Sequence, residues 1–172
     1  MVMTFKGLAK LVEEIGELSQ VAGKKIAYMT GDHPDGKGDL NLRIQNEVGD
    51  VIAAIRFVFG KLELDIDAVN EFAQYESTPT TLNGLPQLAR SLGSLSYAAS
   101  GMMMSIVHVD GQEADQDATQ KRTRSVSLQY EIGLSLASIK FVAKSLNLDQ
   151  QAINNRIAKK IWQYEAWDRQ KP

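Results

Sequence analysis

One stretch decides the fold of this chain: Glu47-Val48-Gly49-Asp50-Val51-Ile52-Ala53-Ala54-Ile55-Arg56-Phe57-Val58. Its apolar side chains recur every three or four residues, which is the period of one face of an α-helix. Similar stripes run over residues 8–26, 85–99 and 128–146, and the stripe of the quoted stretch extends over 44–62. Because no segment shows sustained alternation of apolar and polar residues, the sequence predicts an all-α fold.

The quoted stretch is similar to a later one, Glu131-Ile132-Gly133-Leu134-Ser135-Leu136-Ala137-Ser138-Ile139-Lys140-Phe141-Val142. The match continues without a gap to Asn70 in the first copy and Asn154 in the second. A shared helical pattern explains matching apolar positions, but it does not explain matching glycine, phenylalanine, asparagine and aspartate. We therefore expect a single-chain pseudo-dimer of two helical-hairpin repeats. The repeats are residues 1–76 and 85–172, joined by a linker at 77–84 and packed as one globular unit.

Local signals add detail between the long stripes. Asp65 and Asp149 each follow a leucine, and we expect each to cap the N-terminus of a short further helix by accepting from exposed amide groups. Residues 110–124 lack apolar periodicity and are expected to form an irregular connection.

Composition excludes several classes of function. The 172 residues include 19 basic and 21 acidic residues, a formal charge of -2, so broad electrostatic binding to nucleic acid or to anionic membranes is not expected. The chain has no cysteine and two histidines, which excludes disulfides, thiolate metal sites, cysteine nucleophiles and a histidine-rich zinc site. With no signal-peptide pattern and no apolar run of membrane-spanning length, we expect a cytoplasmic protein.

Paired carboxylates are the strongest chemical signal. Glu14 and Glu17 share one helix face, and Glu47 and Asp50 share one face of another helix, because residues three apart are neighbours on a helix. Where the two helices pack by their apolar stripes, these four carboxylates could converge. All-oxygen ligands favour Mg²⁺, or Mn²⁺, over zinc. The alternative interpretation is a solvated acidic face, to which Glu13, nearer the solvent side, would also belong.

The same residues carry a family resemblance. Leu11-Val12-Glu13-Glu14-Ile15-Gly16-Glu17-Leu18, followed by Glu47-Val48-Gly49-Asp50-Val51, resembles the EExxE…ExxD signature of the MazG-like all-α NTP pyrophosphatases. The loop at 33–40 is also similar to that of small phage and bacterial members. The resemblance covers residues 5–70 well and the second half weakly.

The resemblance implies a Mg²⁺-dependent hydrolase that converts a nucleoside triphosphate to the monophosphate and pyrophosphate, in nucleotide-pool house-cleaning. The acids that match the family's metal ligands are Glu14, Glu17, Glu47 and Asp50. Glu13 would be an outer ligand, a base for the attacking water, or a solvated side chain.

The second half departs from the signature. Only Glu131 survives, opposite Glu47; the remaining positions carry Arg90, Ser91, Ser94 and Leu134. These residues cannot form a second metal site, so we expect one site per chain and a degenerate second repeat.

A triphosphate also needs basic contacts. Lys24 and Lys25 end the first helix, where they also suit the helix dipole. In the second half, Asn154, Arg156, Lys159 and Lys160 could serve the first half's site, or they could form a basic helix face. The substrate would be the main partner, and we expect a homo-oligomer, a dimer of pseudo-dimers.

The competing interpretation is a non-catalytic helical interaction or regulatory protein that kept the fold. Acids paired with lysine and arginine would favour it.

Overall fold

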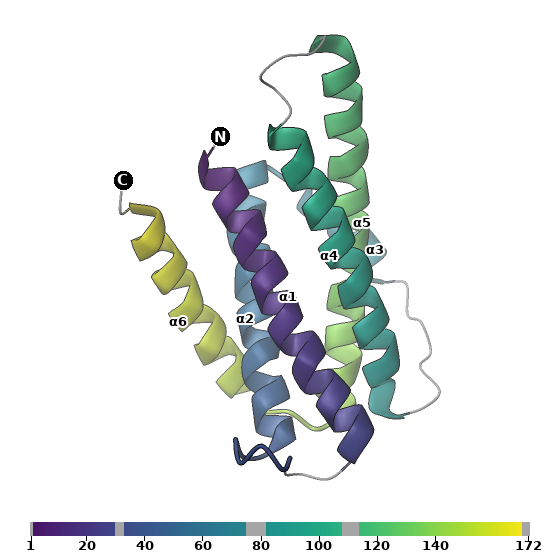
Figure 1. The fold of residues 1–172 in the computed structure, drawn as a ribbon, viewed down its shortest axis with the longest axis vertical. Helices are drawn as coiled ribbons and strands as arrows, with labels where there is room; N and C mark the ends of the chain where they lie inside the picture. The colour runs from purple at the N-terminus through teal and green to yellow at the C-terminus, as the bar shows by residue number, and fades with distance from the viewer. Residues whose placement is uncertain (1, 30–32, 75–81, 108–113, 170–172) are drawn as a thin grey trace.

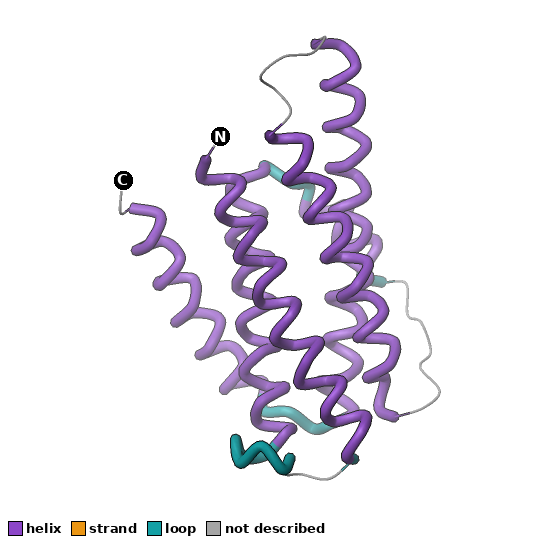
Figure 2. Tube along the Cα trace, viewed as in Figure 1, coloured by secondary structure: helices purple, strands orange, loops and turns teal. Residues whose placement is uncertain are grey.

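The computed structural model describes residues 2–29, 33–74, 82–107 and 114–169. Within these ranges the chain is helical and contains no strand, so the all-α prediction is confirmed (Figures 1 and 2). The elements are α1 (Val2–Tyr28), α2 (Leu40–Leu62), α3 (Ile66–Phe72), the short 3-10 turn η1 (Leu82–Gly84), α4 (Leu85–Val107), α5 (Ala114–Ser145) and α6 (Gln150–Arg169). Of the expected linker, residues 82–84 form η1, and 77–81 lie outside the described residues.

Two long hairpins form the centre of the molecule. Helix α1 packs on α2, α4 packs on α5, and the hairpins meet where α1 lies against α4 (Figure 1). The two shorter helices cross over: α3, from the first half, packs on α5, and α6, from the second half, packs on α2. Each hairpin is therefore covered by a helix from the other half of the chain.

The apolar stripes fill the space between these helices. Fully buried leucines and isoleucines come from every long helix, among them Leu11, Ile44, Leu92, Ile132 and Ile153. They belong to one continuous core, which explains why neither hairpin leaves its stripe exposed. No helix in the described ranges is both long and apolar enough to cross a membrane.

The two expected N-caps are confirmed. The Asp65 side chain accepts hydrogen bonds from the backbone N–H groups of Asp67 and Ala68 at the start of α3. The Asp149 side chain accepts from Gln151 and Ala152 at the start of α6, at 2.8 and 3.1 Å. A carboxylate suits these positions because the first N–H groups of a helix have no partner within it.

The expectation of an irregular connection over residues 110–124 is wrong from Ala114 onward, where α5 has already begun. This part of α5 extends beyond the end of α4 (Figure 1), so it needs no apolar stripe. Its alanine, glutamine, lysine and arginine residues have high intrinsic helix propensity. Residues 110–113 lie outside the described part of the chain.

Two glycines mark the places where the short helices approach the hairpins most closely. A Cβ atom on Gly49 of α2 would lie 2.8 Å from Arg156 Cγ and 3.4 Å from the Ile153 carbonyl oxygen of α6. A Cβ atom on Gly133 of α5 would lie 2.5 Å from Phe72 Cβ and 2.8 Å from the Val69 carbonyl oxygen. A side chain at either glycine would therefore push the covering helix away.

Candidate metal centre

Three carboxylates from two helices meet beneath α6. One oxygen from each of Glu14 on α1 and Glu47 and Asp50 on α2 lies within 4.8 Å of the others. Glu14 is 0% exposed and Asp50 is 1% exposed, while Glu47 is partly buried. The spacing of three residues places Glu47 and Asp50 on the same face of α2, toward α1 and α6. Among the described residues, this is the one group of three or more acids close enough to share a metal ion.

The other two predicted acids lie at the edge of this group. Glu17 is exposed on α1, one turn beyond Glu14, and its charge still acts on Glu47. Glu13 is exposed and forms an ion pair with Lys10 at 2.7 Å. The structure therefore brings three of the predicted acids together and leaves Glu17 and Glu13 beside them.

Cations from α6 face the cluster. Arg156 donates from Nε to Asp50 Oδ1 and from Nη2 to Asp50 Oδ2, each at 2.6 Å. Lys160 Nζ lies 2.9 Å from Asp50 Oδ2 and 3.2 Å from Glu14 Oε1. Because α6 comes from the second half of the chain, the two halves contribute opposite charges to one site.

Glu14 is held by three donors on one oxygen. Its Oε1 accepts from the Tyr164 hydroxyl at 2.8 Å and from Lys160 at 3.2 Å, and Lys10 Nζ lies 3.1 Å away. Its other oxygen, Oε2, is buried and has no hydrogen-bond partner, and the same is true of Glu47 Oε2. Buried carboxylate oxygens are normally satisfied, because leaving one without a partner costs a large part of its hydration free energy. These two oxygens therefore remain available to a cation.

Burial and neighbouring charges shift the pKa values of Glu47 and Glu14 in opposite directions. Burial, together with the charges of Asp50, Glu17 and Glu14, raises the pKa of Glu47 to about 7. Burial also acts to raise the pKa of Glu14, but hydrogen bonds from Tyr164 and Lys10 and the charge of Lys160 outweigh it, so that pKa lies below its ordinary value. At neutral pH, Glu14 is therefore ionised and Glu47 is divided between its two protonation states.

The predicted phosphate contacts are placed in different parts of the molecule. Lys160 lies at the cluster, whereas Lys159, the residue before it on α6, is exposed. Asn154 is exposed and accepts a hydrogen bond from Gln150. Lys24 forms an ion pair with Asp35 at 2.7 Å, in the loop before α2, and Lys25 is partly buried near the end of α1.

Two contacts of the site, Lys10 and Tyr164, lie outside the predicted set of residues. Arg156 was expected beside the phosphates and pairs with Asp50. Lys10 stands four residues before Glu14, so the ion pair is visible in the sequence when it is searched in that direction. Arg156 and Tyr164 stand four residues before and after Lys160, on one face of α6. The sequence predicts this polar face, but it does not identify the helices on which the face packs.

The corresponding place in the second half is built differently. Leu134 stands where Asp50 would be, and Phe72 of α3 lies against Gly133 where Arg156 lies against Gly49. Ser91, at the position of Glu14, is buried and donates its hydroxyl to the Leu88 carbonyl. Burial raises the pKa of Glu131, the acid that remains. Apolar residues thus stand at the positions that carry the Asp50–Arg156 ion pair in the first half.

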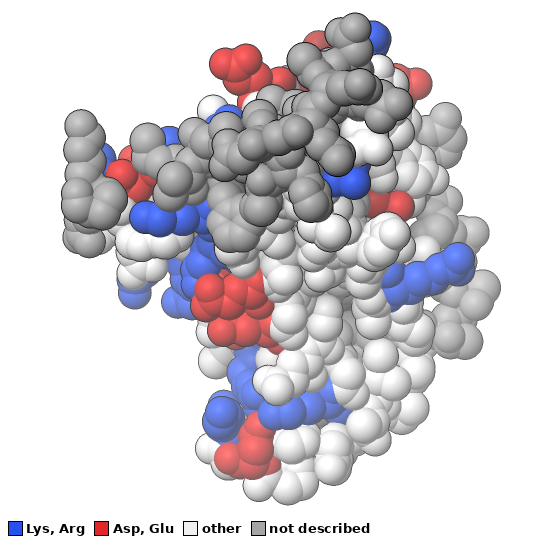
Figure 3. Space-filling view, turned by 45° about the horizontal axis from the view of Figure 1, so that its top comes forward, with Lys and Arg blue, Asp and Glu red and all other residues white. Residues whose placement is uncertain are grey.

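A groove between α1 and α6 opens beside the cluster. Its volume is about 550 Å³, and its lining includes Lys6, Lys10, Glu13, Lys160, Tyr164 and Trp167. Lys6 Nζ lies 5.6 Å from the centre of the Trp167 ring. The face seen in Figure 3 carries acidic and basic side chains beside one another, not a continuous surface of one sign.

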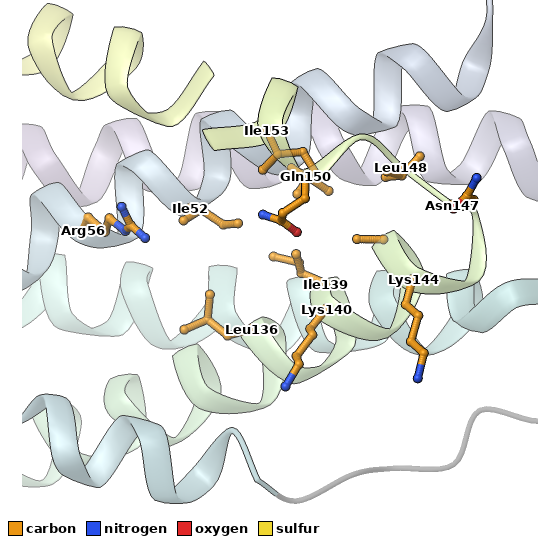
Figure 4. Close-up of a pocket in the computed structure, with 12 residues that line it drawn as sticks. Ile52, Arg56, Leu136, Ile139, Lys140, Lys144, Asn147, Leu148, Gln150 and Ile153 are labelled. Carbon is orange, nitrogen blue, oxygen red and sulfur yellow. The ribbon is translucent and has the colours of Figure 1, made fainter. Parts of the chain in front are cut away.

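A second hollow of about 550 Å³ lies between α2, α5 and α6 (Figure 4). Apolar side chains such as Ile52, Leu136 and Ile139 line it, with Gln150 directed toward its middle. Lys140 and Lys144 extend away from it. None of the described residues that line this hollow is acidic, so it offers no carboxylate ligand to a hard metal ion.

The chain was compared with known proteins by sequence and by structure. No protein-family model matches it, and neither a curated protein nor a solved structure matches it.

Proposed function

We propose that this chain is a divalent-metal-dependent hydrolase that converts a nucleoside triphosphate to the monophosphate and pyrophosphate, as the MazG-like resemblance implies. One observation carries the proposal: Glu14 Oε2 and Glu47 Oε2 are buried without partners in a cluster of three carboxylates. A cation is the partner that would satisfy both atoms. The donor set is oxygen alone, which fits Mg²⁺ or Mn²⁺.

The candidates to hold the ion are the four predicted acids, Glu14, Glu17, Glu47 and Asp50, and among these Glu14 and Glu47 have the buried oxygens without partners. When bound, such an ion would polarise the phosphate oxygens and lower the pKa of a bound water. Tyr164 and Lys10 fix the Glu14 carboxylate through Oε1, which leaves Oε2 available to hold the ion. Lys160, between Glu14 and Asp50, places a positive charge where the phosphates of the substrate would lie.

We also propose that the two halves are diverged copies of one hairpin unit. The offset that pairs Glu47 with Glu131 also pairs Gly49 with Gly133 and Phe72 with Arg156. These pairs make equivalent contacts: Arg156 lies against Gly49, and Phe72 lies against Gly133. Exchange of the covering helices between two related hairpins accounts for this agreement. The predicted assembly of two such chains, and the cytoplasmic location, stay predictions.

One observation favours the second candidate, a non-catalytic interaction protein. Arg156 and Lys160 together give Asp50 three charge-assisted contacts, so part of the cluster is neutralised without a metal ion. That arrangement would stabilise a helical scaffold as well as an active site. The unpartnered oxygens of Glu14 and Glu47 favour the enzyme, because a purely structural site gains nothing from leaving them bare.

The deciding experiment is a hydrolysis screen of all common NTPs and dNTPs with Mg²⁺, in which pyrophosphate and orthophosphate are measured separately. We expect pyrophosphate from at least one nucleotide and loss of that activity in Glu47→Gln. Orthophosphate alone would assign a different bond to the enzyme. A folded protein that hydrolyses no nucleotide would favour the interaction protein.

A further inference from the structure

The Arg156 side chain is fixed by packing and by hydrogen bonds, and it does not extend over the surface. Its stem lies against Gly49, where even a Cβ atom would come within 2.9 Å of Arg156 Cβ. Its guanidinium reaches back to Asp50, one residue further along α2, through two parallel hydrogen bonds of 2.6 Å. Two-point contacts of this kind are the strongest ion-pair geometry available to arginine. The missing side chain of Gly49 and the carboxylate of Asp50 therefore fix one cation at the site.

The oxygen atoms of the three carboxylates differ in how many hydrogen-bond and ion-pair partners they have. Asp50 receives two hydrogen bonds from Arg156 and an ion pair from Lys160, which fill three of the roughly four lone-pair positions of a carboxylate. Glu14 and Glu47 each keep one buried oxygen with no partner. A metal ion can be added at these two oxygens without breaking any contact, whereas ligation by Asp50 competes with Arg156 and Lys160.

The charges around the cluster agree with this division. The acids in and beside the cluster outnumber the bases that contact them by two negative charges when every acid is ionised, which is the charge of one divalent ion. The acids are Glu13, Glu14, Glu17, Glu47 and Asp50, and the bases are Lys10, Lys160 and Arg156. A second divalent ion would leave the buried site with an excess of positive charge, which is costly in a region of low dielectric constant.

We propose that the centre binds a single divalent ion through Glu14 and Glu47, and that Arg156, paired with Asp50, supplies the positive charge that a second ion would otherwise bring. This inference rests on the proposed function for the presence of the ion. Asp50 is then a positioning residue that holds Arg156, not a metal ligand. The metal centre is completed by a helix from the other half of the chain.

The test is a titration of the full-length protein with Mn²⁺, which uses the same oxygen ligands as Mg²⁺ and is counted directly by the EPR signal of the free ion. We expect one bound ion per chain. Glu47→Gln should weaken Mn²⁺ binding more than about tenfold, whereas the charge-balanced double variant Asp50→Asn/Arg156→Gln should stay within about threefold of the parent. Circular dichroism of each variant checks that the helices remain folded.

Two results would overturn the inference alone: two ions per parent chain, or a double variant that loses Mn²⁺ binding as Glu47→Gln does. If the double variant fails to fold, the ion count on the unchanged protein still decides, together with the distance from Asp50 to the anomalous Mn²⁺ peak in soaked crystals. One bound ion without nucleotide hydrolysis would contradict the proposed activity and leave this inference standing. No Mn²⁺ binding would remove both.

Discussion

Glu47 keeps its proton in the folded protein at pH values where the unfolded chain has released it, because burial and the neighbouring acids raise its pKa from 4.5 to about 7. Over that interval the folded state binds more protons than the unfolded state, so the free energy of unfolding falls as the pH rises. Below the lower value both states are protonated, and the contribution of Glu47 is fully present. Above the upper value that contribution is lost.

We therefore expect the parent protein to lose stability relative to Glu47→Gln between pH 5 and pH 8 when no divalent ion is present. The difference should be on the order of 1–2 kcal/mol, since solvent screens a partly exposed group. Urea unfolding in EDTA at four pH values measures it. Parallel pH profiles for the two proteins would show that the Glu47 carboxyl titrates normally.

The individual acids were readable from the sequence because a helix makes residues three apart into neighbours. Glu14, Glu47 and Asp50 do meet. The sequence does not predict which carboxylate oxygens have hydrogen-bond partners. Those partners come from α6, which is more than a hundred residues away along the chain. The same reason explains why Asp50 and Glu47 looked alike in the sequence and differ in the fold.

Gly133 offers the sharpest test of how the covering helices pack. Changing Gly133 to Ala would place a Cβ atom 2.5 Å from Phe72 Cβ and 2.8 Å from a backbone oxygen of α3, so α3 must move. We expect a loss of about 1–3 kcal/mol in the free energy of unfolding, the usual cost of overpacking.

Gly93→Ala is the matched control, because its Cβ atom would meet nothing within 4 Å. That variant should gain up to about 1 kcal/mol from the higher helix propensity of alanine. Chemical unfolding of both variants decides the matter. Equal stabilisation by the two substitutions would mean that α3 does not lie against Gly133.

The helices themselves were predictable, since each apolar stripe is a local pattern with the period of one helix face. The exchange of α3 and α6 between the hairpins was not. An apolar stripe indicates that a helix packs against another element, but it does not identify that element. The two glycines held the information, because a glycine inside a helix marks either a weak point or a close approach. Nothing local distinguishes Gly49 from Gly93.

At the scale of the whole molecule, the second half supplies cations to acids that have no counterpart in its own sequence. Lys160 lies 2.9 Å from Asp50 and 3.2 Å from Glu14, although its own half carries Leu134 and Ser91 at the equivalent positions. Under the proposed duplication, this arrangement gives a physical reason for retaining the second half. Packing alone would also retain the second half, so the two explanations need separate readouts.

Adjacent lysines on α6 separate them. Lys160→Ala should lower kcat/KM for the nucleotide by roughly ten- to a hundredfold, since it removes a charge-assisted contact worth about 1.5–3 kcal/mol. Lys159→Ala is the control, because Lys159 is exposed one position away and carries the same charge. Glu131→Ala should cost far less than Glu47→Ala, because no acid of its own half completes a site around it. If Lys160→Ala and Lys159→Ala both keep the parent kcat/KM in folded protein, α6 is a packing helix and its cations serve the fold alone.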